Sequence, residues 1–310
     1  MNRRQTLGGL ASLAASPLYG GTVRAADSVL RLAAPPTDAS AQYYYADAEG
    51  FFKKAGLPCE IAHLANGEAI TAAVIGGSVD IGAGQAISIV TAYSRGLPVT
   101  ILAGTSVNTP SAEAGVLFVP KNSTATTGKD LDGKTIGVQG LKGFAQFGTQ
   151  AWLDRTGGNS STVHFVEMTS AVMGRALADS RIDAAFIPEP FVSEVAKVAQ
   201  KIANPMDAIA PAFIAGAHFT TLGWAKAHPE EVQRFVRVIY STAAWANKNH
   251  ARTAEILADA THVDPTTMRT AVRARYAEHR DTSLLAPMIN LAVKYAGITP
   301  FSAEELFFKT

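Results

Sequence analysis

The 310-residue sequence predicts an α/β fold built from two similar lobes. Short β-branched segments alternate with segments of helical apolar spacing, which is typical of parallel sheets covered by helices on both faces. The same order of segments occurs twice, and matching positions keep a near-constant separation. Asp80 and Asp183 are 103 positions apart, and His63 and Phe165 are 102 apart. A repeated order with a constant separation predicts two lobes of similar topology.

The first copy begins at Leu30 and ends near Gly84. Gly56 stands where its first helix should stop, because glycine adopts the left-handed conformation that ends many helices. We expect strands and helices to alternate along this copy, starting with a strand, at 29–36, 40–56, 59–64, 67–77 and 79–84. The second copy begins at Thr135 and repeats this order, at 135–140, 144–158, 163–168, 170–180 and 182–190.

The segments between and after the copies predict how the lobes are joined. Strands are expected at 99–104 and 115–120, and the second of these crosses to the other lobe. The segment 212–224 can cross back, and the remainder is expected to be helical. We therefore expect a discontinuous lobe one (27–117 and 222–310) and a lobe two at 118–221. Two crossing segments form a hinge, with a cleft between the lobes.

The N-terminus resembles an export signal. Arg3 and Arg4 precede a small, weakly apolar stretch, and small residues around Ala26 suit cleavage. We expect residues 1–26 to be a signal peptide, and the arginine pair suggests the twin-arginine route. A disordered basic tail is the alternative. Because Cys59 is far from the cleavage site, a lipid-anchored form is not expected, and the mature chain should be periplasmic.

Composition excludes several classes of function. A net charge of +1 gives no reason to expect nucleic acid or an anionic membrane as a partner. No apolar run is long enough to span a bilayer. A single cysteine excludes an internal disulfide and a cysteine-based metal cluster. The seven histidines are scattered, and the sequence has no G-x-S-x-G motif. We therefore expect no metal, no cofactor and no catalytic nucleophile.

The segment "GKDLDGKT" (128–135) matches the phosphate-loop pattern G-x-x-x-x-G-K-[ST]. A phosphate loop follows a strand and opens a helix, so that free N–H groups meet the phosphates. Here a polar stretch precedes the match and a strand-like stretch follows it. Asp130 and Asp132 would also repel phosphate. We interpret the segment as a short helix and a turn that lead into a strand.

The segments that follow the expected strands are the candidate binding segments, because ligands of open α/β sheets bind beyond the carboxyl ends of the strands. After the first strand, Asp38, Ser40 and Gln42 can form hydrogen bonds with a ligand. Ser40 is equally suited to cap the next helix. Tyr43 begins a run of three tyrosines, which cannot all face the same way on a helix, so one is expected at the cleft and another in the core.

Glycine-containing turns follow two other strands. "GAGQAI" supplies Gly84, Gln85 and Ala86, but it lacks the third glycine of a dinucleotide-binding motif. "GLKGFAQ" supplies four more candidates in lobe two, which are Gly140, Lys142, Gly143 and Phe144. Glycine lets a backbone approach a ligand, helix N-termini favour anions, and Lys142 adds a cation. Ordinary tight turns are the alternative, and for Phe144 with Phe147 packing in the core is favoured.

Three further positions complete the candidate set. Thr105 lies in the first crossing segment, where Ser106 and Asn108 are also plausible polar contacts. Thr169 follows a strand of the second copy. Glu189 follows the last strand of that copy, where it can pair with a cationic ligand group, cap a turn or contact the hinge.

Several segments together resemble the nitrate/sulfonate/taurine (NMT1/THI5-like) family of ABC-transporter substrate-binding proteins. They are "YYYADAEGFFKKAGLPCEI", "GGSVDIGAG", "GLPVTILAG", "KDLDGKTIGV" and "SRIDAAFIPEP". The resemblance implies a type II periplasmic-binding-protein fold with a hinge and a ligand cleft. It also implies a small-molecule ligand, a membrane permease, and a separate subunit that hydrolyses ATP. We expect a monomeric binding protein rather than an enzyme.

Two alternatives remain open. Pyrimidine-precursor synthases and a menaquinone-pathway dehydratase share this architecture, but the synthases carry a cysteine-rich motif and the dehydratase is cytoplasmic. A periplasmic sensor domain is the other alternative. The turn amides and Lys142 favour an organic anion such as a sulfonate, a taurine-like compound or a carboxylate, since the tyrosines and phenylalanines suit an apolar body.

Overall fold

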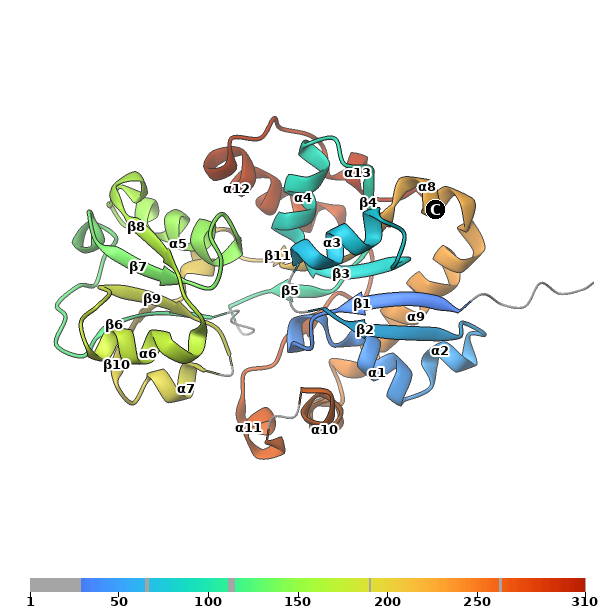
Figure 1. Cartoon of the computed structure of the whole chain (residues 1–310), viewed down its shortest axis with the longest axis horizontal. Helices are drawn as coiled ribbons and strands as arrows, with labels where there is room; N and C mark the ends of the chain where they lie inside the picture. The colour runs from blue at the N-terminus through green and yellow to red at the C-terminus, as the bar shows by residue number, and fades with distance from the viewer. Residues whose placement is uncertain (1–28, 65–66, 111–114, 190, 262–263, 310) are drawn as a thin grey trace, which may run out of the picture.

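The computed structural model describes residues 29–64, 67–110, 115–189, 191–261 and 264–309. The expected signal peptide lies outside this part of the chain. The fold is α/β, with two five-stranded sheets side by side and a three-stranded sheet between them (Figure 1). The strand orders are β2-β1-β3-β12-β4 in the first sheet, β10-β6-β9-β7-β8 in the second and β11-β5-β13 in the third.

The first sheet combines the strands of the first copy with the segments expected at 99–104 and 212–224. Its strands are β1 (Leu30–Ala34), β2 (Cys59–His63), β3 (Ile81–Gln85), β4 (Val99–Gly104) and β12 (Gly216–Thr221). Its helices are η1 (Asp38–Ser40), α1 (Gln42–Ala48), α2 (Phe51–Lys54), α3 (Gly67–Ile75) and α4 (Ala86–Ser94). The single helix expected at 40–56 is divided, because Gly50 adopts a left-handed φ of 69° between α1 and α2.

The second sheet combines the strands of the second copy with the crossing strand expected at 115–120 and one further strand. Its strands are β6 (Val116–Pro120), β7 (Thr135–Val138), β8 (His164–Glu167), β9 (Ala184–Ile187) and β10 (Ala199–Ala203). Its helices are η2 (Lys129–Leu131), α5 (Phe144–Arg155), η3 (Ser160–Thr162), α6 (Ser170–Ala178), α7 (Val192–Val195) and η4 (Pro205–Ala208). Strand β10, which pairs antiparallel with β6, was not expected from the sequence.

The internal repeat is visible in the hydrogen bonds. Asp80 accepts a hydrogen bond from the backbone N–H of Arg31 at 2.8 Å, at the start of the first sheet. Asp183 accepts the equivalent bond from Thr135 at 2.9 Å, at the start of the second. In both lobes the aspartate backbone N–H returns a bond to the same partner's carbonyl. The separation of 103 positions therefore reflects one structural device used twice.

The crossing strands move the lobe boundaries that we expected. Strand β12 pairs antiparallel with both β3 and β4, so it belongs to the first sheet, although its residues fall within the range expected for lobe two (118–221). Strand β6 pairs with β9 in the second sheet and already begins at Val116. Each crossing strand runs antiparallel to a neighbouring strand of the repeat.

The C-terminal part is mainly helical, as expected. It contains α8 (Leu222–Ala227), α9 (Pro229–Ala246), α10 (His250–Thr261), α11 (Pro265–Thr270), η5 (Thr282–Leu285), α12 (Ala286–Ala296) and α13 (Ala303–Leu306). Helix α9 packs on the first sheet, where Phe235 contacts the ring of Phe52. Helix α12 instead packs against both α4 and α5, so it bridges the two lobes (Figure 1). Within the described residues, none of the helices has the length and hydropathy needed to cross a membrane.

Candidate ligand-binding cleft

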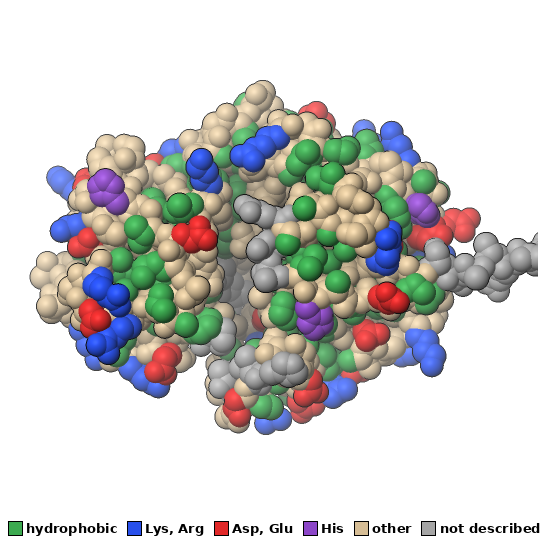
Figure 2. Space-filling model, viewed as in Figure 1, with side chains coloured by type: hydrophobic (Ala, Val, Ile, Leu, Met, Phe, Trp, Pro, Cys, Tyr) green, Lys and Arg blue, Asp and Glu red, His purple; other side chains and the backbone are tan. Residues whose placement is uncertain are grey.

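The parallel strands of both sheets point toward the middle of the molecule. Strands β2 and β3 are parallel to β1, and β8 and β9 are parallel to β7. The carboxyl ends of the two sets lie toward the short third sheet, with strands β5 (Ser106–Asn108), β11 (Phe213–Ile214) and β13 (Arg275–Tyr276) (Figure 1). The molecular surface is hollowed between the lobes (Figure 2). This is where an open α/β sheet places a ligand.

Three buried polar side chains lie where β4 continues into β5. Thr105, Ser106 and Asn108 are 0%, 5% and 3% exposed. Their side-chain oxygen and nitrogen atoms have no hydrogen-bond partner among the described residues. An unpaired buried polar group costs about 1–3 kcal/mol, so such groups call for a partner. Three of them in four positions mark this hinge segment as a candidate for polar ligand contacts.

The structure brings Thr105 close to the turn after β3. The backbone N–H of Thr105 donates to Gly216 O at 2.8 Å, and that of Ala86 donates to Ala215 O at 2.9 Å. A Cβ atom on Gly216 would lie 2.4 Å from Thr105 Oγ1 and 3.1 Å from Gly84 O. Glycine at this position thus keeps the Thr105 hydroxyl beside the end of β3, to which Gly84 and Gln85 belong, and beside Ala86, which begins α4.

The turn after β7 has an unusual backbone. Lys142 has a left-handed φ of 58°, and its N–H donates to Gln146 Oε1 at 2.7 Å. Gly140 and Gly143 flank it, and the Lys142 side chain is exposed. A non-glycine residue in this conformation is uncommon and often marks a functional turn. The turn therefore holds an exposed cation at the start of α5.

Phe144 opens α5, but its ring lies in the core. It is 7% exposed and contacts the ring of Phe213 at a centroid distance of 6.0 Å. Phe147 is 1% exposed. The structure supports the core interpretation of both residues. It does not support a contact between Phe144 and a ligand.

The loop after β1 departs most from expectation. The Asp38 carboxylate is already engaged by Arg273, Ala274 N, Tyr45 and Tyr276. This leaves it poorly suited to bind a ligand directly. Ser40 is buried and ends η1, and the N-cap position of α1 is Ala41, so Ser40 does not cap that helix.

Gln42 and Tyr43 lie inside lobe one. Both are 0% exposed, and Tyr43 packs against Phe52, Phe235 and His218. Gln42 Oε1 lies 2.7 Å from His218 Nε2, and burial lowers the pKa of His218 to about 3. The neutral imidazole donates to the amide oxygen, since an oxygen accepts. Tyr43 is therefore a core residue, as are Tyr44 and Tyr45.

The remaining candidates stay near the ends of β8 and β9. Thr169 is exposed at the N-cap of α6 and makes no capping hydrogen bond with its side chain. Glu189 is half-buried two residues after β9. Sequence reasoning missed the pair formed by Gln139 and Ser170, in which Gln139 Nε2 donates to Ser170 Oγ at 2.6 Å. This bond ties the turn after β7 to the turn after β8.

Sequence reasoning also missed three exposed apolar side chains in lobe two. Leu141, Val172 and Phe191 are 49%, 45% and 37% exposed. They follow β7, β8 and β9, which are neighbours in the sheet order β9-β7-β8. Leu141 lies in the turn before α5, Val172 in the first turn of α6 and Phe191 directly before α7, so each follows the end of a strand at the cleft side of lobe two. Hydrophobicity alone could not indicate them, because most apolar residues of this chain are buried.

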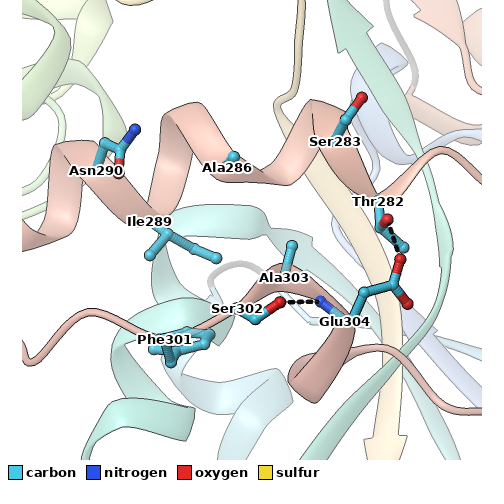
Figure 3. A pocket seen from close by; sticks show the side chains of 9 residues that line it. All are labelled: Thr282, Ser283, Ala286, Ile289, Asn290, Phe301, Ser302, Ala303 and Glu304. Atoms are coloured by element: carbon cyan, nitrogen blue, oxygen red, sulfur yellow. Dashed lines mark hydrogen bonds between the residues drawn. The ribbon is translucent and has the colours of Figure 1, made fainter.

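A separate hollow lies between α12 and α13 (Figure 3). It has a volume of about 330 Å³ and is lined by Thr282, Ser283, Ala286, Ile289, Asn290, Phe301, Ser302, Ala303 and Glu304. The Glu304 carboxylate already has partners within the protein, because it accepts a hydrogen bond from Thr282 and forms an ion pair with Arg280. The hollow belongs to the C-terminal helices and is not part of the cleft.

Two sequence motifs have structural explanations. In "GKDLDGKT" a 3₁₀ helix (η2) and a turn at Gly133, with φ 70°, lead into β7. The interpretation as a turn before a strand is confirmed, and the geometry is not that of a phosphate loop. In "GAGQAI", Gly82 packs its backbone against Ile70 and Phe219, since a Cβ would lie 2.5 Å from Ile70 Cγ2. The described residues contain no cluster of three histidine, cysteine or acidic side chains able to hold a metal.

Solved structures with a similar fold include two sulfonate-binding proteins and one protein from a yeast. The aliphatic sulphonate binding protein SsuA from Escherichia coli is 15% identical, with a TM-score of 0.73 over 91% of this chain and 92% of that chain. The alkanesulfonate-binding protein SsuA from Xanthomonas axonopodis pv. citri, bound to MOPS, is 17% identical, with a TM-score of 0.72 over 91% and 98%. The Candida albicans CA3427 product is 13% identical, with a TM-score of 0.68 over 88% and 92%.

The last of these is described as having the generic periplasmic binding protein fold, and the likenesses establish that this chain has the periplasmic-binding fold. The family follows from the sequence comparison. A family model described as NMT1/THI5 like matches residues 38–252, so the chain belongs to the NMT1/THI5-like family. No curated protein sequence matches the chain significantly.

Proposed function

We propose that this protein is the exported solute-binding component of an ABC importer, which captures a small organic anion in the cleft between its lobes. The observation that carries the proposal is the set of buried side chains of Thr105, Ser106 and Asn108 at the hinge, which have no hydrogen-bond partner among the described residues. They lie between two sheets whose parallel strands end there. A permease and a separate ATPase subunit would then receive the solute. Family membership and the fold of the sulfonate-binding relatives support this role.

Binding is favoured over catalysis by the same residues. The hydroxyl groups of Thr105 and Ser106 have no hydrogen-bond partner among the described residues, so no described side chain is placed to remove their protons. An activated nucleophile needs a base within hydrogen-bond reach. Uncharged hydroxyl and amide groups can instead orient a polar ligand group without reacting with it.

An organic anion is favoured by the starts of two helices, one in each lobe, and by one lysine. The exposed Lys142 supplies a positive charge, and helices α4 and α5 begin at the turns after β3 and β7. The exposed side chains of Leu141 and Phe191 offer an apolar surface that nitrate would not use. The candidate set is therefore Thr105, the junction of β3 and α4 at Gly84–Ala86 and the turn at Gly140–Gly143, with Thr169 and Glu189 at its margins.

A thermal-shift screen of residues 27–310 tests the proposal. The panel contains alkyl and aryl sulfonates, taurine, MOPS, nitrate, carboxylates and pyrimidines. A ligand at about a thousand times its dissociation constant adds about 4 kcal/mol to the free energy of unfolding, which raises Tm by about 8–16 °C for a domain of this size. We expect a shift of this order with an organic sulfonate or carboxylate. Absence of a shift with every member would refute the proposal.

Replacing Lys142 tests the assignment of the charge. Lys142→Ala should weaken binding of an organic sulfonate about two- to fivefold, because an exposed ion pair contributes about 0.5–1 kcal/mol. Affinity for an uncharged analogue should not change. Lys121→Ala is the matched control, since Lys121 is also exposed. It follows β6, which runs antiparallel to β9, so it lies at the other end of the strands from the turn that carries Lys142. Equal effects of the two substitutions in titration calorimetry would exclude this role for Lys142.

A further inference from the structure

The loop after β1 is held by a network that is centred on Asp38. Arg273 donates to both carboxylate oxygens, from Nε at 3.1 Å and from Nη2 at 2.7 Å. The backbone N–H of Ala274 donates to Oδ2 at 2.6 Å. Tyr45 and Tyr276 donate to Oδ1 at 3.1 and 2.9 Å. Every donor except Tyr45 comes from a segment more than 230 positions away in the sequence.

The network is shielded from water, which makes it strong. The side chains of Arg273 and Asp38 are 10% and 22% exposed. Tyr45 also accepts a bond from Arg273 Nη2 at 2.8 Å, so the hydroxyl joins the two charged groups. Hydrogen bonds to the carboxylate raise the pKa of Arg273 despite burial. A two-pronged arginine–carboxylate contact also fixes orientation, which a single hydrogen bond does not.

The partners of Asp38 lead directly into the hinge. Tyr276 belongs to β13, which pairs antiparallel with β5 so that Tyr276 lies opposite Ser106. The Tyr276 hydroxyl also lies 2.5 Å from the Asp38 backbone carbonyl, so its single proton is shared between two oxygen atoms of Asp38. The side chain of Asn247, at the end of α9, holds the Tyr276 backbone: Nδ2 donates to the Tyr276 carbonyl at 3.0 Å, and Oδ1 accepts from the Tyr276 N–H at 2.9 Å. One aspartate thus connects the loop after β1 to the strand that carries Ser106 and Asn108.

We propose that Asp38 is a positioning residue, which locks the loop after β1 onto the hinge sheet through Arg273 and Tyr276, so that the lobe-one half of the binding site is formed before a solute arrives. This inference rests on the proposed function only for its effect on affinity. The mechanical connection exists in the free protein. A preformed half-site binds more tightly because less conformational freedom is lost on binding.

Hydrogen exchange of the ligand-free protein tests the connection directly. The variants are Asp38→Asn, which removes the charge, and two milder ones, Arg273→Lys and Tyr276→Phe, in case the first does not fold. Glu49→Gln is the matched control, because Glu49 pairs with Arg252 on the same lobe, at the end of α1, without touching the hinge. We expect exchange to rise about tenfold at both 36–42 and 104–110 in the test variants. The control should change neither segment.

Other exchange patterns would overturn the inference. A rise confined to 36–42 would show that Asp38 stabilises only its own loop. An equal rise at β7, in the other lobe, would show a general loss of stability in place of a connection. No rise at 104–110 in either Arg273→Lys or Tyr276→Phe would also contradict the proposal, whatever Asp38→Asn does.

Affinity gives a second readout that distinguishes this inference from the proposed function. For whichever of MOPS, taurine or benzenesulfonate binds the wild type, the test variants should bind about tenfold more weakly, with the loss in the association step because the half-site must first be assembled. Unchanged affinity would overturn the inference. A wild type that binds none of the three would count against the proposed sulfonate ligand, while the exchange experiment would still decide the role of Asp38.

Discussion

A single buried imidazole should make the stability of this protein depend on pH. Burial lowers the pKa of His218 to about 3, against about 6.5 in the unfolded chain. The unfolded state therefore binds the proton more readily, and stability falls as pH decreases below 6.5. Between pH 7.5 and 5.5 we expect a loss of about 1.4 kcal/mol from this residue. Urea denaturation at the two pH values measures it.

The matched comparison uses two histidine variants. His218→Asn should lose most of this pH dependence, although it costs stability at every pH. His164→Asn, at an exposed position that begins β8, should retain it. If His218→Asn kept the wild-type pH dependence, another group would be responsible.

Gly216 is the glycine whose missing Cβ matters most for the cleft. Gly216→Ala should cost about 1–3 kcal/mol and weaken solute binding, because the added methyl group would displace the Thr105 hydroxyl, 2.4 Å away. Gly223→Ala is the control, since nothing lies within 4 Å of its Cβ position and it lies in helix α8. That change should be neutral or stabilise by up to about 1 kcal/mol. Thermal denaturation and calorimetry measure both; equal stability of the two variants would contradict this account.

At this scale the sequence locates segments better than side chains. The turn at Gly140 follows a strand as expected, whereas Gly84 and Gln85 belong to β3 itself, because periodicity locates the end of a strand only to within a few residues. The partners of Asp38 were not predictable, since Arg273 lies 235 positions away and meets it only through the packing of the C-terminal segment. A helical pattern alone could not assign Tyr43 to the core or to the cleft. It predicts that three successive side chains point in different directions, and here all three directions are covered by other parts of the chain.

Among the elements, helix α12 joins the lobes through one carboxylate. Burial opposes the charge on Asp154, but Lys294, Ser160 and Tyr295 lower its pKa to about 2. Asp154→Ala should cost about 1–2 kcal/mol at pH 7, because it leaves several donors without an acceptor. Lys294→Ala should cost less than about 1 kcal/mol, since the Lys294 side chain is 58% exposed. Urea denaturation ranks the two.

The contribution of Asp154 has a defined pH range. Its folded pKa is below the unfolded value, so the contribution is complete above about pH 4 and disappears as the pH falls toward 2. Equal losses for Lys294→Ala and Asp154→Ala would show that the ion pair, and not the other hydrogen bonds of Asp154, dominates this contact.

The strands of the repeat were predictable because each is a local pattern followed by a helix. Strands β5, β11 and β13 were not predicted as a sheet, since they have only 3, 2 and 2 residues and are defined by partners far apart in the sequence. Strand β12 was seen as a crossing segment, but its place between β3 and β4 depends on antiparallel pairing that leaves no periodic signal.

For the whole molecule, the fold predicts a closing motion. A solute held between the lobes should bring them together, because contacts with both lobes favour the closed state. Small-angle scattering of residues 27–310 should show a smaller radius of gyration with a saturating sulfonate that binds. The same compound should leave Gly216→Ala more open at equal concentration. A radius that does not change on saturation would argue against closure around the solute.

The two antiparallel crossing strands also set an order of folding. The second sheet is complete within 116–203, a continuous stretch, and can form as soon as that stretch is available. The first sheet lacks β12 until residue 221 has been added, although its other strands end at Gly104. During synthesis from the N-terminus, the first sheet therefore remains incomplete, with β12 missing between β3 and β4, while the second sheet forms. That waiting period is when an unfinished sheet edge is most exposed to aggregation, so the transient risk falls on the first lobe.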